Sequence, residues 1–211
     1  MSNPRLHAQW LRTRRDFLRQ IKSQVAGHLG EDSITLRNYA SFYERELKHR
    51  WVESSKAELM KAIERSHIVF AGDFHPFAQA QRTHLRILRS LPRKRKVLLA
   101  LEALGSTYQN EIDEYLKGSL VESEFLRKIQ WEAGWGFPWS HYEPLLALAR
   151  LRKFDVVGLN LGTKAGKTES LEKRDRHAGK IIADLYEHHG DETLIYVLFG
   201  AIITTFVLTF S

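Results

Sequence analysis

The chain has 211 residues, a formal net charge of +7 and no cysteine, which excludes disulfide bonds, thiolate metal ligands, a cysteine nucleophile and iron–sulfur clusters. Hydrophobic residues make up 43% and charged residues 27%, which argues against wholesale disorder and suits one principal domain. The positive charge favours an anionic partner, and nucleic acid, anionic lipid and small carboxylates all meet that requirement.

The amino-terminal third is predicted to be helical. Apolar residues recur every three or four positions over residues 5–25 and again over residues 36–63, and the second run is interrupted at Ser54–Ser55. We therefore expect a helical extension, residues 1–64, ahead of an α/β domain, residues 65–211. These helices either pack on that domain or form an arm that binds a partner. No apolar signal segment opens the chain, so the default location is the cytoplasm.

The rest of the chain alternates short apolar runs, rich in β-branched residues, with amphipathic runs. The predicted strands are residues 68–71, 97–101, 155–160 and 194–199. The predicted helices are residues 77–91, two short helices within 107–130, 141–153 and 170–189. Residues 131–140 contain two glycines and a proline and are predicted to form a loop. Strands alternating with helices are typical of an α/β fold with a mostly parallel sheet flanked by helices.

An uncharged stretch covers residues 194–210, close to the minimum length of a membrane-spanning helix. Its three threonines and its β-branched residues favour a strand followed by an atypical end. We therefore expect this tail to make no membrane contact, and a membrane anchor is the alternative.

Polar residues stand where the predicted strands end. Asp73 and His75 follow the first strand, Glu102 follows the second, and Asn160 and Gly200 end the other two. Parallel strands have their carboxyl ends at one edge of the sheet, where ligands bind in α/β folds. Because imidazole and carboxylate groups bind Zn, Mn or Fe, His75 is predicted as a metal ligand, with Asp73 and Glu102 as oxygen donors. The alternative is that His75 is a hydrogen-bonded structural residue.

Two further groups are candidates for cofactor binding. Arg174 and Asp175 open the last predicted helix, where they either hold an anionic ligand, orient His75, or form local charge pairs. The aromatic segment with Trp139 and Tyr142 offers flat surfaces for a planar cofactor, and Tyr142 carries the phenol of a haem axial ligand. Core packing is the alternative use of these rings.

Gly72-Asp73-Phe74-His75 resembles the G-E-x-H strand end of the ChaN-like haem-binding uptake family, within the wider Tiki, TraB and erythromycin-esterase superfamily. Four more segments are similar in order and spacing: L-E at 101–102, W-x-x-Y-x-P-L at 139–145, the strand end at Asn160, and R-D-x-x at 174–177. The resemblance covers residues 60–203. It implies that the chain binds haem or iron at the carboxyl edge of the sheet, with haem or a small molecule, not nucleic acid, as its partner. A homodimer is compatible with it. Metal-dependent hydrolysis of the Tiki or erythromycin-esterase type is the alternative, so whether the chain is an enzyme stays open.

Several positions depart from the family pattern. Asp73 stands where the family has Glu, and Ala178-Gly179 stands where it usually has Met-Ala. The last strand of the family ends in G-x-x-H, but Ile203 occupies the position of that histidine. The lipid-anchoring cysteine of the family is missing as well. The absence of the G-x-x-H histidine at Ile203 predicts a domain that is truncated or altered at its carboxyl end.

Overall fold

The structure is a computed structural model that describes Gln9, Arg12, Thr13, Asp16, Arg19, residues 54–161 and residues 171–200. The chain divides into two units, residues 1–53 and 54–211, and the second unit contains the sheet. Most of the helix predicted over residues 5–25 lies outside the described residues, although the five described positions within it are helical. The position of Ile203 and the rest of the tail after Gly200 also lie outside them.

Helix α3, Lys56–Arg65, is the first element of the second unit. Its start is set by a capping box, in which the Ser55 hydroxyl accepts from the Glu58 backbone N–H (3.2 Å) and the Glu58 carboxylate accepts from the Ser55 N–H (2.7 Å). Ser55 has extended backbone angles, so the single long helix predicted over residues 36–63 is wrong at this point. Met60 and Ile63 are buried in the core beside the sheet. The boundary of the proposed extension, residues 1–64, stays a prediction.

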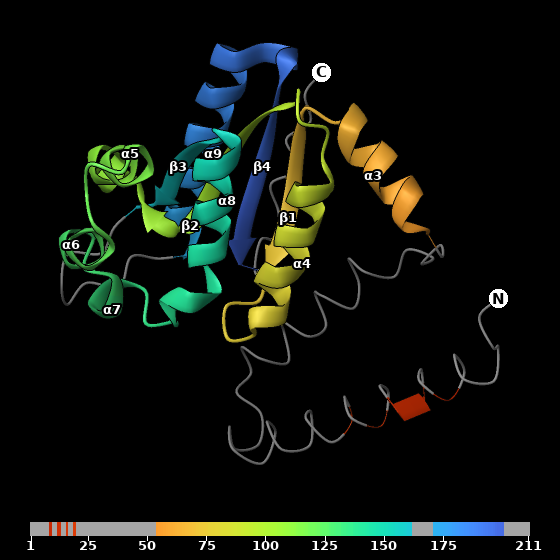
Figure 1. The fold of residues 1–211 in the computed structure, drawn as a ribbon, viewed down its shortest axis with the longest axis horizontal. Coiled ribbons are helices and arrows are strands. Elements are labelled where there is room, and N and C mark those ends of the chain that lie inside the picture. Colours follow the sequence, from red (N-terminus) through yellow and green to blue (C-terminus); the bar gives the residue numbers. More distant parts are fainter. Residues whose placement is uncertain are drawn as a thin grey trace. The chain divides into compact units, whose positions relative to one another are not determined.

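Four parallel strands form the sheet in the order β1-β4-β2-β3 (Figure 1). They are β1 (Ile68–Asp73), β2 (Lys96–Gly105), β3 (Asp155–Asn160) and β4 (Thr193–Gly200). The predicted α/β fold with a mostly parallel sheet is therefore confirmed. Strand β4 is central and is buried from Thr193 to Phe199, because its alternate side chains enter the cores on both faces of the sheet. Burial on both faces explains why this part of the chain carries no charge.

Seven α-helices of the described residues flank the sheet. Besides α3 they are α4 (Ala78–Ser90), α5 (Gln109–Lys117), α6 (Glu122–Lys128), α7 (Trp131–Gly134), α8 (Glu143–Arg152) and α9 (Leu171–His189), with 3₁₀ turns η1 (Ser106–Tyr108), η2 (Trp139–His141) and η3 (Gly190–Glu192). Ala178 and Ile182 of α9 pack on one face of the sheet, and helices α3 to α8 contribute to the core on the other. Among the described residues, none of these helices combines the length and the apolar character needed to cross a membrane.

Strand β1 includes Asp73, which was predicted to follow it, and two further differences from the predicted elements bear on the site. Strand β2 continues to Gly105, because its end pairs with Asn160 of β3 after an irregularity in register. Glu102 therefore lies inside β2 and not beyond its end. The segment predicted as a loop contains helix α7, which follows Gln130 in the left-handed region (φ 52°) and is closed by the hydrogen bond from Trp135 N–H to the Trp131 carbonyl (2.9 Å). A helix of four residues is too short to show a helical period in the sequence.

A buried histidine joins α4 to two strands. Nε2 of His84 lies 3.0 Å from the carbonyl oxygen of Gly72 on β1, and Nδ1 lies 2.9 Å from the hydroxyl of Tyr196 on β4. A carbonyl only accepts, so Nε2 carries the proton, and the Tyr196 hydroxyl donates to Nδ1. Both contacts are made by the neutral imidazole, and burial lowers the pKa of His84 below its usual 6.5.

The free energy of unfolding is expected to decrease as the pH falls below about 6.5, because the unfolded chain binds a proton at His84 that the folded chain resists. The stabilisation that neutral His84 contributes is complete above that pH, and it is lost as the pH falls through the lowered pKa of His84. Urea denaturation at about pH 7.5 and about pH 5.5 measures the effect, which His84→Gln should reduce. The exposed His188→Gln is the control and should keep the pH dependence of the wild type. An unchanged pH dependence in His84→Gln contradicts the assignment.

Candidate functional site

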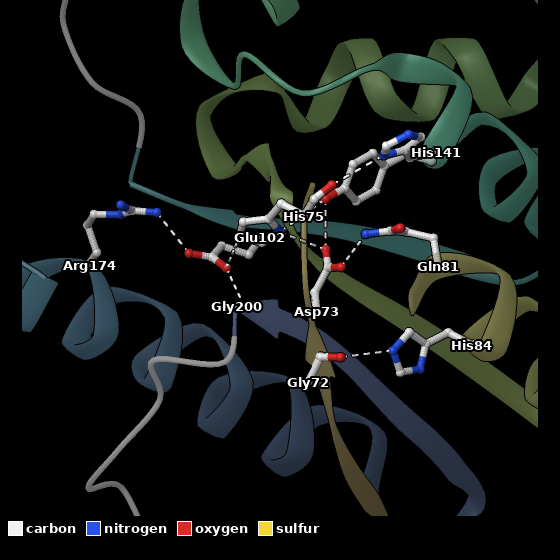
Figure 2. Close-up of polar contacts among 10 residues, drawn as sticks. Gly72, Asp73, His75, Gln81, His84, Glu102, His141, Arg174 and Gly200 are labelled. Atoms are coloured by element: carbon white, nitrogen blue, oxygen red, sulfur yellow. Dashed lines mark hydrogen bonds and ion pairs between the residues drawn. The ribbon is translucent and has the colours of Figure 1, made fainter. Parts of the chain in front are cut away.

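The site begins where β1 ends, with Asp73 and His75 (Figure 2). His75 stands in a turn closed by the hydrogen bond from Phe77 N–H to the Phe74 carbonyl (2.9 Å). Asp73 is 3% exposed, and its Oδ2 lies 2.9 Å from Nδ1 of His75. Because a carboxylate accepts, Nδ1 of His75 carries the proton and Nε2 presents its lone pair on the opposite side of the ring.

Two side chains from other elements hold Asp73 in place. Tyr142, which precedes α8, donates its hydroxyl proton to Asp73 Oδ2 (2.8 Å), and its oxygen lies 3.1 Å from Nδ1 of His75. Gln81 of α4 donates its amide N–H to Asp73 Oδ1. His141 lies close by, with its Nδ1 3.2 Å from the carbonyl oxygen of His75. The imidazole orientation is therefore fixed by contacts from β1, α4 and the segment before α8.

On the other side of the imidazole lies Glu102 of β2, as Figure 2 shows. Its Oε2 is 3.6 Å from Nε2 of His75 and accepts from the backbone N–H of Gly200 (2.5 Å), while Oε1 pairs with Arg174 of α9 (2.8 Å). Burial raises the pKa of Glu102, although the Gly200 N–H, His75 and Arg174 act in the opposite direction. The Glu102 carboxyl group and Nε2 of His75 therefore face each other at the end of β4.

Access to the imidazole is narrow. Its ring meets Trp135 edge to face at a centroid distance of 4.5 Å, and Phe137 lies 5.2 Å away. A side chain on Gly200 would place its Cβ 3.0 Å from both Nε2 of His75 and Oε2 of Glu102, so the imidazole or the carboxylate would have to shift to admit it. The His75 side chain is accordingly 19% exposed.

The structure brings together five of the seven residues predicted for the site, namely Asp73, His75, Glu102, Tyr142 and Arg174. Tyr142 is 1% exposed and burial raises its pKa, so its hydroxyl is a neutral donor inside the network. Whether these residues bind a cofactor stays a prediction.

The other two predicted residues lie apart from this network. In the part of the chain that the structure describes, no hydrogen bond or ion pair joins Asp175 to His75 or Glu102. Burial nevertheless raises the pKa of Asp175, while the adjacent Arg174 lowers it. Trp139 belongs to an aromatic cluster with Trp131, at a centroid distance of 4.9 Å.

Gln81 and His141 were missed by the sequence reasoning. Gln81 interrupts the apolar side of α4 one turn before Leu85, and a polar residue at a buried helical position signals a buried polar contact. Nothing in the sequence around His141 indicates its contact with the His75 carbonyl. A second pair nearby, Ser106 Oγ and His177 Nε2, at 2.8 Å, joins η1 to α9 and was also missed.

The metal assignment of His75, Asp73 and Glu102 stays a prediction. Asp73 contacts Nδ1 whereas Glu102 faces Nε2, so an ion bound at Nε2 would meet Glu102 and leave Asp73 to orient the ring. Within residues 54–161 and 171–200 and the few described residues before them, no three His, Asp or Glu side chains are grouped so as to hold a metal ion.

A groove of about 840 Å³ lies beside this network, and we call it the tryptophan groove. Its lining includes Leu126 and Arg127 of α6, Trp131 and Ala133 of α7, and Phe137 and Trp139 of the following segment. Phe137 is shared, since one side of it lines the groove and its ring lies beside His75. The indole Nε1 of Trp139 is buried and has no hydrogen-bond partner among the described residues.

Comparison with known proteins places this architecture in a family. A family model described as haem-binding uptake, Tiki superfamily, ChaN matches residues 59–172, which is more than half of the chain. A comparison with curated protein sequences finds no match.

Among solved structures, ChaN of Campylobacter jejuni, described with cofacial haem binding, has a TM-score of 0.51 at 17% identity, over 71% of this chain and 76% of that one. Two bacterial protein toxins also have TM-scores of 0.51, one at 19% identity over 70% of this chain and 30% of the toxin, the other at 18% over 88% and 41%. The chain thus spans less than half of each toxin, and at these identities the likeness concerns the fold. On the family match, the chain belongs to the ChaN haem-binding uptake family of the Tiki superfamily.

Proposed function

We propose that the chain binds haem at the carboxyl edge of its sheet, with the tryptophan groove as the surface that receives the flat ring. The observation that carries the proposal is the groove itself, whose volume of about 840 Å³ falls within the range of small-molecule sites. Membership of the family supports it, as does the haem bound by ChaN of Campylobacter jejuni.

The residues of the groove suit a porphyrin. Trp131, Phe137 and Trp139 provide apolar aromatic surface, and burial of such surface is worth about 25 cal/mol per Å². Arg127 provides a cation for a propionate. Bound haem would supply an iron centre to this edge of the protein.

The residues of the buried network have a supporting role in this proposal. His75 and Tyr142 lie behind two residues that line the groove. Phe137 lies between the groove and His75, and Trp131 packs on Tyr142 at a centroid distance of 5.4 Å. Arg174 holds the Glu102 carboxylate, and Asp175 lies next to that pair on α9. In this way the network fixes the wall of the groove.

Filling the groove is expected to abolish most of the binding. Ala133 is exposed on α7 and lines the groove, so Ala133→Trp should weaken hemin binding by about tenfold or more, equivalent to about 1.4 kcal/mol, without a change in the core. Saturable absorbance titration with hemin measures the affinity. The matched control is Ala57→Trp, which adds the same side chain at an exposed position of α3 and should bind like the wild type. Equal affinities in all three proteins, or no saturable binding by the wild type, contradict the proposal.

A further inference from the structure

Among the residues that the structure describes, the lining of the tryptophan groove contains no side chain that ligates iron. Haem iron in proteins is held by His, Cys, Met or Tyr side chains. No residue of these four types lines the groove in the part of the chain that the structure describes. Its lining instead combines aromatic and aliphatic side chains with one cation, Arg127, and one carboxylate, Glu132.

Two side chains of those types that stand behind the groove, Tyr142 and His75, are engaged elsewhere. The hydroxyl of Tyr142 donates to Asp73 and its side chain is buried, so it would have to leave that acceptor to reach an iron in the groove. Nδ1 of His75 is held by Asp73, and Nε2 faces Glu102 beneath the end of β4. Phe137 and Trp135 also stand against the imidazole. Ligation by either residue would therefore break the buried network.

The contacts that the groove does offer are independent of a metal. Packing on Trp131, Phe137 and Trp139 depends on the area of the ring, and Arg127 meets a carboxylate at its periphery. We infer, on the basis of the proposed function, that the groove recognises the porphyrin ring and its carboxylates and not the iron, so that metal-free porphyrin is a ligand equal to haem.

Titration of the full chain with hemin, zinc protoporphyrin IX and metal-free protoporphyrin IX tests this inference, with quenching of tryptophan fluorescence as the measure of binding. The three dissociation constants are expected to agree within about threefold, and Ala133→Trp should weaken all three by the same factor. Hemin binding that is about tenfold or more tighter than that of the metal-free ring overturns the inference and leaves the proposed function standing. Failure of all three ligands to bind overturns both.

The absorbance spectrum of the hemin complex provides a second readout. Without a protein ligand the axial positions of the iron stay open, so added imidazole should shift the Soret band of the bound hemin. A spectrum that resists imidazole shows a protein ligand on the iron and overturns the inference.

Discussion

Replacement of Asp73 by alanine is expected to lower the free energy of unfolding by about 3 kcal/mol, the largest loss for any single polar side chain of the site. Asp73 is 3% exposed and accepts from Tyr142, Gln81 and His75, so its removal takes the acceptor away from the buried donors of Tyr142 and Gln81. Nδ1 of His75 keeps the Tyr142 oxygen at 3.1 Å as a neighbour. Each buried donor without a partner costs free energy, because it has given up its contact with water on folding. Urea denaturation at neutral pH, followed by circular dichroism, measures the loss.

A second aspartate of the same domain is the matched control. Asp113 on α5 is half-buried and accepts one hydrogen bond, from the amide of Gln109 (2.9 Å). Because Gln109 also donates to the Val156 carbonyl, Asp113→Ala should cost less than about 1 kcal/mol. Similar losses in Asp73→Ala and Asp113→Ala would show that the Asp73 network contributes no more than an ordinary hydrogen bond.

The second large effect is expected at Gly158, where β3 passes β2. A Cβ at this position would lie 2.6 Å from the carbonyl oxygen of Gly105 and 2.9 Å from that of Leu104. Both contacts are with backbone atoms of β2, and Gly105 pairs with Asn160 of β3, so neither atom can move aside as a flexible side chain would. Gly158→Ala is expected to force the strands apart and lower the free energy of unfolding by about 2 kcal/mol.

Replacement of Gly179 on α9 is expected to have the opposite effect on the free energy of unfolding. A Cβ added there meets nothing within 4 Å, and alanine favours a helix over glycine, so Gly179→Ala should raise the free energy of unfolding by about 0.5 kcal/mol. Thermal unfolding of both variants and the wild type measures whether each substitution lowers or raises the stability. A Gly158→Ala protein as stable as the wild type would mean that β2 and β3 can separate locally without cost.

Much of the fold could be predicted from the sequence, because each strand is marked by the residues of a short stretch of the chain. Strand β3 has the bounds predicted for it, and β4 extends one residue beyond its prediction at each end. Both are short runs of apolar residues, and burial on two faces of the sheet requires such runs whatever their neighbours are. The end of β2 was not readable, because its last residues belong to a strand only through the pairing of Gly105 with Asn160, more than fifty residues away.

The same division holds for the site. Residues at the carboxyl ends of parallel strands must share an edge, so the sequence by itself brought Asp73, His75 and Glu102 together. Which nitrogen of His75 each carboxylate meets depends on the packing of Tyr142 and Gln81 against β1, which no local pattern encodes.

Arg174 and Asp175 show where sequence information ends. Both were predicted as site residues because they lie at the start of the last predicted helix. Adjacent residues on an α-helix project about 100° apart, so one packing of α9 on the sheet cannot turn both toward the same partner. The sequence alone determined the composition, the four strands and the polar residues at the strand ends. The order of the strands in the sheet and the orientation of α9, which places Arg174 beside Glu102, were decided by the tertiary structure, in which Ala178 and Ile182 enter the core.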